Sequence, residues 1–96
     1  MEKTGRWLHT DGAETTVKPA NDQQFTLPEL QSMVGGAIEL IPVARTGKRM
    51  EYLVVNEDGR RLQLPLNVKA TEVMVSIGRR EAIVGNAVIV PLELIS

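Results

Sequence analysis

The chain has 96 residues, 43% of them hydrophobic, and a formal net charge of −1 from eleven Lys or Arg and twelve Asp or Glu. This balanced charge excludes a general nucleic-acid binder and a strongly acidic nucleic-acid mimic. The absence of cysteine excludes disulfides, thiolate nucleophiles and zinc-thiolate sites. The length predicts one domain over residues 1–96, with residues 1–4 flexible, whose small core would gain from association with a second copy.

The distribution of apolar residues gives no sign of a membrane or export segment. The longest nearly unbroken apolar run, residues 82–92, is interrupted by Gly85 and Asn86 and is too short to cross a bilayer. Residues 1–10 lack the apolar core of a signal peptide. We therefore expect a cytoplasmic protein that contacts no membrane.

The chain begins with a predicted β-hairpin. β-favouring residues stand on both sides of Asp11 and Gly12, a dipeptide typical of tight turns between strands. The pattern predicts strands over residues 5–10 and 14–18.

Residues 25–36, with the sequence FTLPELQSMVGG, carry the start and stop signals of a helix. Thr26 and Glu29 have the spacing of a capping box, and Phe25 and Leu30 have the spacing of a hydrophobic staple. A proline suits the first turn, and the two glycines at the end suit a left-handed stop. These signals predict a helix over residues 27–34 with an apolar face of Leu27, Leu30 and Val34, and with Met33 beside them.

Two strands are predicted after this helix, on either side of a polar loop at residues 44–49. The first covers residues 37–43 and contains Pro42, which favours a strand at the edge of the sheet or the end of a strand over a central strand, because proline has no N–H for pairing. The second covers residues 50–56.

The clearest hairpin signal follows the second of these strands. The turn sequence Glu57-Asp58-Gly59 separates it from another β-rich run, residues 60–67. The pattern predicts that these two runs pair, with Gly59 free to adopt positive φ at the turn.

The last third of the chain predicts one more helix and further β structure. Asn67 can cap a helix over residues 68–76, which Gly78 ends. Residues 81–94 read either as a hairpin that turns on Gly85-Asn86, which is slightly favoured, or as one long strand with a bulge there. The helix offers two apolar sets, one of Val68, Thr71 and Val75 and one of Ala70 and Met74.

The expected fold class is therefore α+β. We expect a mainly antiparallel sheet of about six or seven short strands, with two short helices on one face of the sheet. Nothing in the pattern requires a doubly wound parallel sheet.

The inventory of chemical groups argues against an enzyme. His9 is the only histidine, so a nucleophilic triad would depend on one residue beside a hairpin turn. Zinc and iron sites need several His or Cys ligands, and Glu57 and Asp58 lack the ligand spacing of a calcium loop. No phosphate-binding glycine motif occurs. We expect no catalytic residues, no metal and no cofactor.

Basic residues in or beside predicted turns form a possible anion site. If the turns converge, clustered guanidinium groups could hold a phosphate through paired hydrogen bonds. Charge pattern alone favours a simpler interpretation, in which the same residues are solvated and protect the sheet edges. The candidate ligand-binding residues are Arg45, Lys48, Arg49, Arg60 and Arg61, with Asn67 and Thr71 as polar contacts if helix capping leaves them free.

Four short motifs occur in a fixed order: FTLPELQSMVGGAIE, VVNEDG, LPLNVKAT and IVGNAV. Together they resemble a small domain family of unknown function that is widespread in bacteriophages and other mobile elements, and the resemblance extends over about residues 16–90. Pro28 and Ala37 depart from the pattern, where a glutamate and an aromatic residue are expected. The resemblance implies a phage origin and a location in the host cytoplasm, and it brings no known active site.

Three functions are compatible with these features. The favoured hypothesis is a non-enzymatic phage protein that sequesters a nucleotide-derived host immune signal in a pocket formed by a homo-oligomer. The alternative is a protein-interaction module that inhibits a host or defence protein through a sheet edge or an apolar helix face. A third, weaker hypothesis is a phosphodiesterase-like enzyme, which would need His9 or a metal bound by carboxylates.

Overall fold

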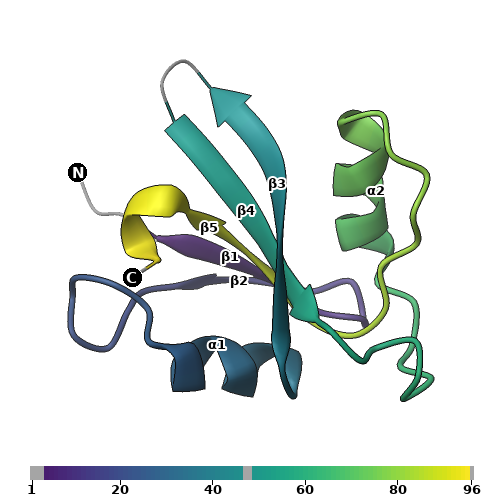
Figure 1. Ribbon diagram of the computed structural model, residues 1–96, viewed down its shortest axis with the longest axis horizontal. Helices are drawn as coiled ribbons and strands as arrows, with labels where there is room; N and C mark the ends of the chain where they lie inside the picture. The colour runs from purple at the N-terminus through teal and green to yellow at the C-terminus, as the bar shows by residue number, and fades with distance from the viewer. Residues whose placement is uncertain (1–3, 47–48, 96) are drawn as a thin grey trace.

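The computed structural model describes residues 4–46 and 49–95, and for residues 44–46 and 49 it describes the backbone only. Its five strands form one antiparallel sheet in the order β2-β1-β5-β4-β3, accompanied by two α-helices and a short 3₁₀ helix (Figure 1). The elements are β1 (Gly5–Leu8), β2 (Glu14–Val17), α1 (Leu27–Val34), β3 (Ile38–Thr46), β4 (Arg49–Asn56), α2 (Val68–Ser76), β5 (Ala87–Pro91) and η1 (Leu92–Leu94).

The predicted first hairpin is confirmed, with strands slightly shorter than expected. β1 and β2 pair across a turn in which the Asp11 carboxylate accepts a hydrogen bond from the Ala13 N–H (2.8 Å). The His9 N–H donates to the Ala13 carbonyl (2.9 Å), which closes the hairpin. The expectation for residues 1–4 falls mainly on residues 1–3, which lie outside the described part of the chain.

The helix predicted over residues 27–34 is confirmed as α1, with its capping box. The Thr26 N–H donates to the Glu29 carboxylate (2.8 Å), and the Glu29 N–H donates to the Thr26 hydroxyl (3.3 Å). The same carboxylate accepts a hydrogen bond from the Ala20 N–H (2.9 Å). These backbone donors stabilise the charged form and lower the pKa of Glu29 below its ordinary value. Gly35 ends the helix at φ 86°.

One residue of the predicted α1 face is not buried. Leu30 and Val34 pack in the core, as expected, but Leu27 is 52% exposed. Phe25 closes the core at this end of the helix instead, since its N–H donates to the Leu94 carbonyl (2.7 Å) and its side chain is buried. The predicted staple partners, Phe25 and Leu30, lie in the same apolar cluster.

The strands expected at residues 37–43 and 50–56 are confirmed as β3 and β4, which extend further into the polar loop than predicted. β3 is the outer strand of the sheet, so the prediction that Pro42 lies at an edge is also confirmed. The pairing with β4 shifts by one residue between Pro42 and Ala44, which indicates a β-bulge.

The hairpin predicted across residues 57–59 is wrong. Residues 57–63 form consecutive turns, and residues 60–67 contain no strand, only an isolated bridge from Leu66 to Val84. The turn is set by Asn56, whose side-chain oxygen accepts a hydrogen bond from the Asp58 N–H (2.8 Å). The two edges of β4 are already paired with β3 and β5, so no position remains for an additional strand beside it.

Gly59 serves a purpose that differs from the predicted one. Its φ is not positive. Instead, it is buried against the segment that precedes β5: a Cβ atom added at Gly59 would lie 2.9 Å from the Val84 side chain. Glycine therefore allows two irregular segments to approach each other closely.

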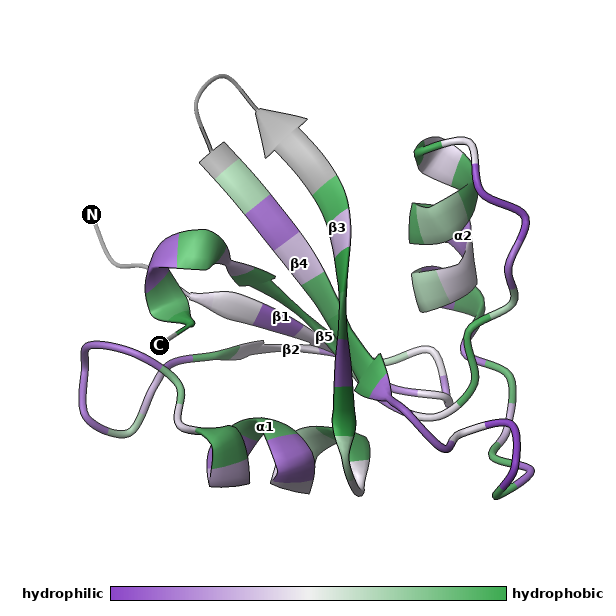
Figure 2. Cartoon of the chain, in the orientation of Figure 1, coloured by the Kyte–Doolittle hydropathy of each residue, from purple (hydrophilic) through white to green (hydrophobic). Residues whose placement is uncertain are grey.

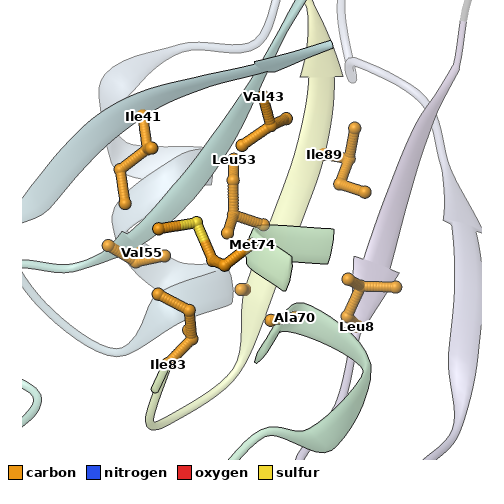
Figure 3. Close-up of a cluster of buried hydrophobic side chains, with 10 residues drawn as sticks. Leu8, Ile41, Val43, Leu53, Val55, Ala70, Met74, Ile83 and Ile89 are labelled. Carbon is orange, nitrogen blue, oxygen red and sulfur yellow. The ribbon is translucent and has the colours of Figure 1, made fainter. Parts of the chain in front are cut away.

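The helix predicted over residues 68–76 is confirmed as α2. Of the two apolar sets on this helix, the set of Ala70 and Met74 is buried, whereas Val68 and Val75 are more than half exposed. Figure 3 shows the Met74 side chain among the apolar side chains of the sheet.

Both interpretations of residues 81–94 are wrong. Residues 81–86 form neither the first arm of a hairpin nor part of a long strand, and β5 begins only at Ala87 and is followed directly by η1. With residues 60–67 also outside the sheet, the described residues form five strands instead of six or seven.

The two helices lie on opposite faces of the sheet, which corrects the expectation that they share one face. Alternate residues of β4 belong to different apolar clusters: Leu53 packs with Met74 of α2, and Val54 packs with Leu30 of α1. β5 alternates in the same way, and all five of its residues are buried. A central strand that is apolar on both faces needs a cover on each, and β5 is drawn in green in Figure 2.

Candidate functional site

Asn67, a predicted polar contact for a ligand, is fully buried, and both its side-chain oxygen and its NH₂ group form hydrogen bonds within the chain. Its side-chain oxygen accepts a hydrogen bond from the Ala70 N–H (3.0 Å) and so caps α2. Its side-chain NH₂ group donates to the carbonyls of Leu8 and Gly85, both at 2.9 Å. Asn67 therefore ties α2, β1 and the segment before β5 together, and capping does not leave it free.

Thr71, the second predicted polar contact, has a similar structural position one turn further along α2. Its hydroxyl oxygen accepts a hydrogen bond from the Ile83 N–H (2.9 Å) and lies 3.4 Å from the Ile83 carbonyl oxygen. The Asn67 N–H donates to that carbonyl (2.8 Å). Both residues thus fix the segment before β5 against α2.

The two predicted arginines of the turn after β4 are exposed, and each has a partner in the chain. The Arg60 guanidinium donates to the Ala82 carbonyl (3.1 Å). Arg61, whose side chain is 72% exposed, forms an ion pair with Asp58 at 3.3 Å. Such exposed pairs are weak, so both guanidinium groups could exchange these partners for an anion.

The other basic candidates lie elsewhere. Lys48 is outside the described residues, and only the backbone is described for Arg45 and Arg49. Arg49 begins β4 and Asn56 ends it, so the two ends of this strand are about 23 Å apart at about 3.3 Å per residue. The start of β4 and the turn that holds Arg60 are therefore at opposite ends of this strand (Figure 1), and one chain does not bring the backbones of Arg45 and Arg49 close to Arg60.

Other residues of the four sequence motifs also have structural roles. The side-chain NH₂ of Asn56, a buried residue, donates to the Val34 carbonyl at the end of α1 (3.2 Å). The Asn86 side-chain oxygen accepts a hydrogen bond from the Thr10 N–H (3.0 Å). Asn56 thus connects β4 to the end of α1, and Asn86 connects the segment before β5 to the turn after β1.

A shallow cavity of about 150 Å³ lies between the start of β3, the turn after β4 and the segment before β5. Three carboxylates line it, those of Glu39, Glu57 and Glu81, against the single guanidinium of Arg60. Glu81 pairs with Arg79, while the described residues provide no ion-pair partner for Glu39 or Glu57. The cavity therefore favours a cation over an anion.

The single histidine, His9, contacts two side chains of the first hairpin. His9 Nε2 lies 3.0 Å from the Thr15 hydroxyl, and its ring lies 4.4 Å from that of Trp7, centroid to centroid. Among residues 4–46 and 49–95, no group of three or more His, Cys, Asp or Glu side chains is arranged to hold a metal ion.

No helix in this part of the chain is long and apolar enough to cross a membrane.

The outer edge of β3 is unpaired in the described structure, and the register with β4 shows which groups it presents. The Glu57 N–H donates to the Ala37 carbonyl (2.8 Å), so these opposed residues form a hydrogen-bonded pair. Hydrogen-bonded and non-hydrogen-bonded pairs alternate along an antiparallel ladder. Ile38 and Leu40 therefore occupy non-hydrogen-bonded positions, and their N–H and C=O groups point away from β4.

The opposite edge of the sheet, β2, is less suited to pairing. It has only four residues, and Glu14 on this strand binds the Arg6 guanidinium through two hydrogen bonds of 2.8 and 3.2 Å. Lys69 of α2 also lies 3.7 Å from this carboxylate. The hydrogen bond from Arg6 lowers the pKa of Glu14 and raises that of Arg6. A short, charged strand of this kind protects an edge from pairing.

Comparison with known proteins identifies one family. A family model described as "Domain of unknown function (DUF3846)" matches residues 8–93, which is nearly the whole chain, so the chain belongs to this family. No curated protein and no solved structure matches the chain.

Proposed function

We propose that this DUF3846 domain is a non-enzymatic binding protein that recognises an extended segment of another protein along the edge of β3. The observation that carries the proposal is the register of β3, which directs the N–H and C=O groups of Ile38 and Leu40 away from the sheet. An extended peptide can add to such an edge as a further strand.

The side chains at this edge suit an added strand. Leu40 is 41% exposed, and the coloured part of β3 in Figure 2 is mostly green, with one strongly purple band. Main-chain bonds to the four outward groups would contribute roughly 2–6 kcal/mol, at about 0.5–1.5 kcal/mol each. Side-chain contacts must therefore supply much of the affinity and the choice of partner.

The resemblance to domains of phages and other mobile elements favours a host or defence protein as the partner. The domain would then inhibit this partner by occupying a segment that the partner needs for its own contacts. We also propose that the protein acts in the host cytoplasm.

Sequestration of a nucleotide-derived signal is the second candidate, favoured by the exposed guanidinium groups of Arg60 and Arg61. The backbones of Arg45 and Arg49 are at the far end of the β3–β4 hairpin, so a site built from these residues together with Arg60 and Arg61 requires two copies of the chain. A small molecule that stays with the purified protein in a native mass spectrum, and is lost after charge reversal at Arg60 and Arg61, would favour this candidate over peptide binding.

Replacing Leu40 by proline is expected to weaken peptide binding at least about tenfold without unfolding the domain, because it removes one main-chain hydrogen bond and the leucine side chain. The substitution removes an N–H that makes no bond to β4, at an edge that already contains Pro42. The test selects peptides from a random display library on the wild-type protein and measures the binding of each to Leu40→Pro by fluorescence anisotropy.

Two control variants separate the edge from other effects. Thr16→Pro removes the corresponding outward N–H on β2, since His9 and Ala13 form the hydrogen-bonded pair that sets the register of that hairpin. Leu40→Ala removes the side chain but keeps the N–H. Selected peptides should bind Thr16→Pro normally, Leu40→Ala more weakly and Leu40→Pro most weakly of all. Peptides that bind all four proteins equally, or a selection that enriches none, would contradict the proposed function.

A further inference from the structure

The side chains of β3 alternate between the two faces of the sheet. Glu39 is paired with Val55, which packs on the α2 face, and Leu40 is paired with Val54, which packs on the α1 face. A strand added to this edge would follow the same alternation, with opposed side chains about 4.5–5.5 Å apart at Cβ. Consecutive residues of a bound segment would therefore meet Glu39 on one face and Leu40 on the other.

The acidic cavity adjoins this edge on the α2 face. Glu39 belongs to both features, since it lies on β3 and lines the cavity together with Glu57 and Glu81. The Arg60 guanidinium in the same cavity is directed to the Ala82 carbonyl. The carboxylates alone would select only for charge, whereas the strand edge beside them fixes the position and direction of a bound chain.

We infer that the segment recognised at β3 alternates basic and apolar residues, with a lysine or arginine directed to Glu39 and Glu57 and the adjacent apolar side chain directed to Leu40. The inference rests on the proposed function and adds the chemistry of the partner. A cation opposite Glu39 would face carboxylates that have no ion-pair partner among the described residues. The neighbouring apolar residue would cover the exposed part of Leu40.

The test uses two short fluorescent peptides, one that alternates lysine with valine and one that alternates glutamate with valine. The wild-type protein should bind the lysine peptide at least about tenfold more tightly than the glutamate peptide, and added salt should weaken that binding. The double variant Glu39→Lys, Glu57→Lys should reverse the preference. Glu72→Lys, a reversal at an exposed position on α2 outside the cavity, should leave it unchanged.

The outcomes separate this inference from the proposed function. Equal binding of both peptides, no binding of either, or an unchanged preference after the double reversal would overturn the inference. If library peptides without basic residues still require Leu40, the edge binds a partner of different chemistry, so the proposed function stands and the inference fails. A wild-type dimer that Leu40→Pro dissociates would show that a second copy occupies the edge, and this also overturns the inference. Melting curves of each variant confirm that it is folded.

Discussion

Asn67→Ala is expected to lower the free energy of unfolding by about 3 kcal/mol, from one lost helix cap and two lost hydrogen bonds to buried carbonyls. The residue is fully buried, and alanine would leave the carbonyls of Leu8 and Gly85 without this donor. A loss of this size is a large share of the stability of a small domain. Urea denaturation followed by circular dichroism measures it.

The matched control for this substitution is Asn21→Ala. The Asn21 side-chain oxygen accepts hydrogen bonds from the N–H groups of Gln23 and Gln24, but all these residues are exposed. Water can replace an exposed acceptor, so the loss should stay below about 1 kcal/mol. Equal losses for the two variants would show that Asn67 does not connect the segments as described.

Met74→Ala is expected to lower the free energy of unfolding by about 2–5 kcal/mol, because it leaves a cavity where α2 meets the sheet. Met74 is fully buried in the cluster that includes Leu53 and Val55 (Figure 3). The neighbouring substitution Val75→Ala removes a side chain that is 63% exposed and should change stability by less than about 0.5 kcal/mol. Chemical denaturation of both variants tests which apolar set of the helix is buried, and a larger effect for Val75→Ala would contradict the fold.

Local signals predicted the parts of the fold that depend on neighbouring residues. The capping box of Thr26 and Glu29 and the following glycine act within a few positions, so α1 was predicted with its observed boundaries. The cap by Asn67 identified α2 in the same way. Which of the two apolar sets of α2 is buried depends on how the helix packs against the sheet. The spacing of residues along the helix does not show this.

The errors concern pairing between distant segments. A turn sequence beside two β-rich runs favours a local hairpin, but β4 pairs with β5 instead of residues 60–67. Strand β5 also explains why the helices lie on opposite faces. Its sequence AVIVP has no polar position, and a strand of that kind needs cover on both sides.

The candidate site was only partly accessible from sequence. The residue types of Asn67 and Thr71 suggested polar contacts, but their hydrogen bonds to Gly85 and Ile83 depend on segments that meet only in the folded chain. One residue of the sequence, Pro42, indicated that β3 lies at an edge of the sheet. Which of its N–H groups point outward depends on the register with β4, and the sequence does not specify that register.

Residue-resolved amide hydrogen exchange by NMR tests the central claim, that a partner strand pairs with the outer edge of β3. In the free protein, the amides of Glu39 and Ile41, which face β4, should exchange slowly, and those of Ile38 and Leu40 should exchange fast. Addition of a peptide selected on the wild-type protein should slow the exchange of Ile38 and Leu40 specifically. Unchanged exchange at both residues in the saturated complex would contradict the account.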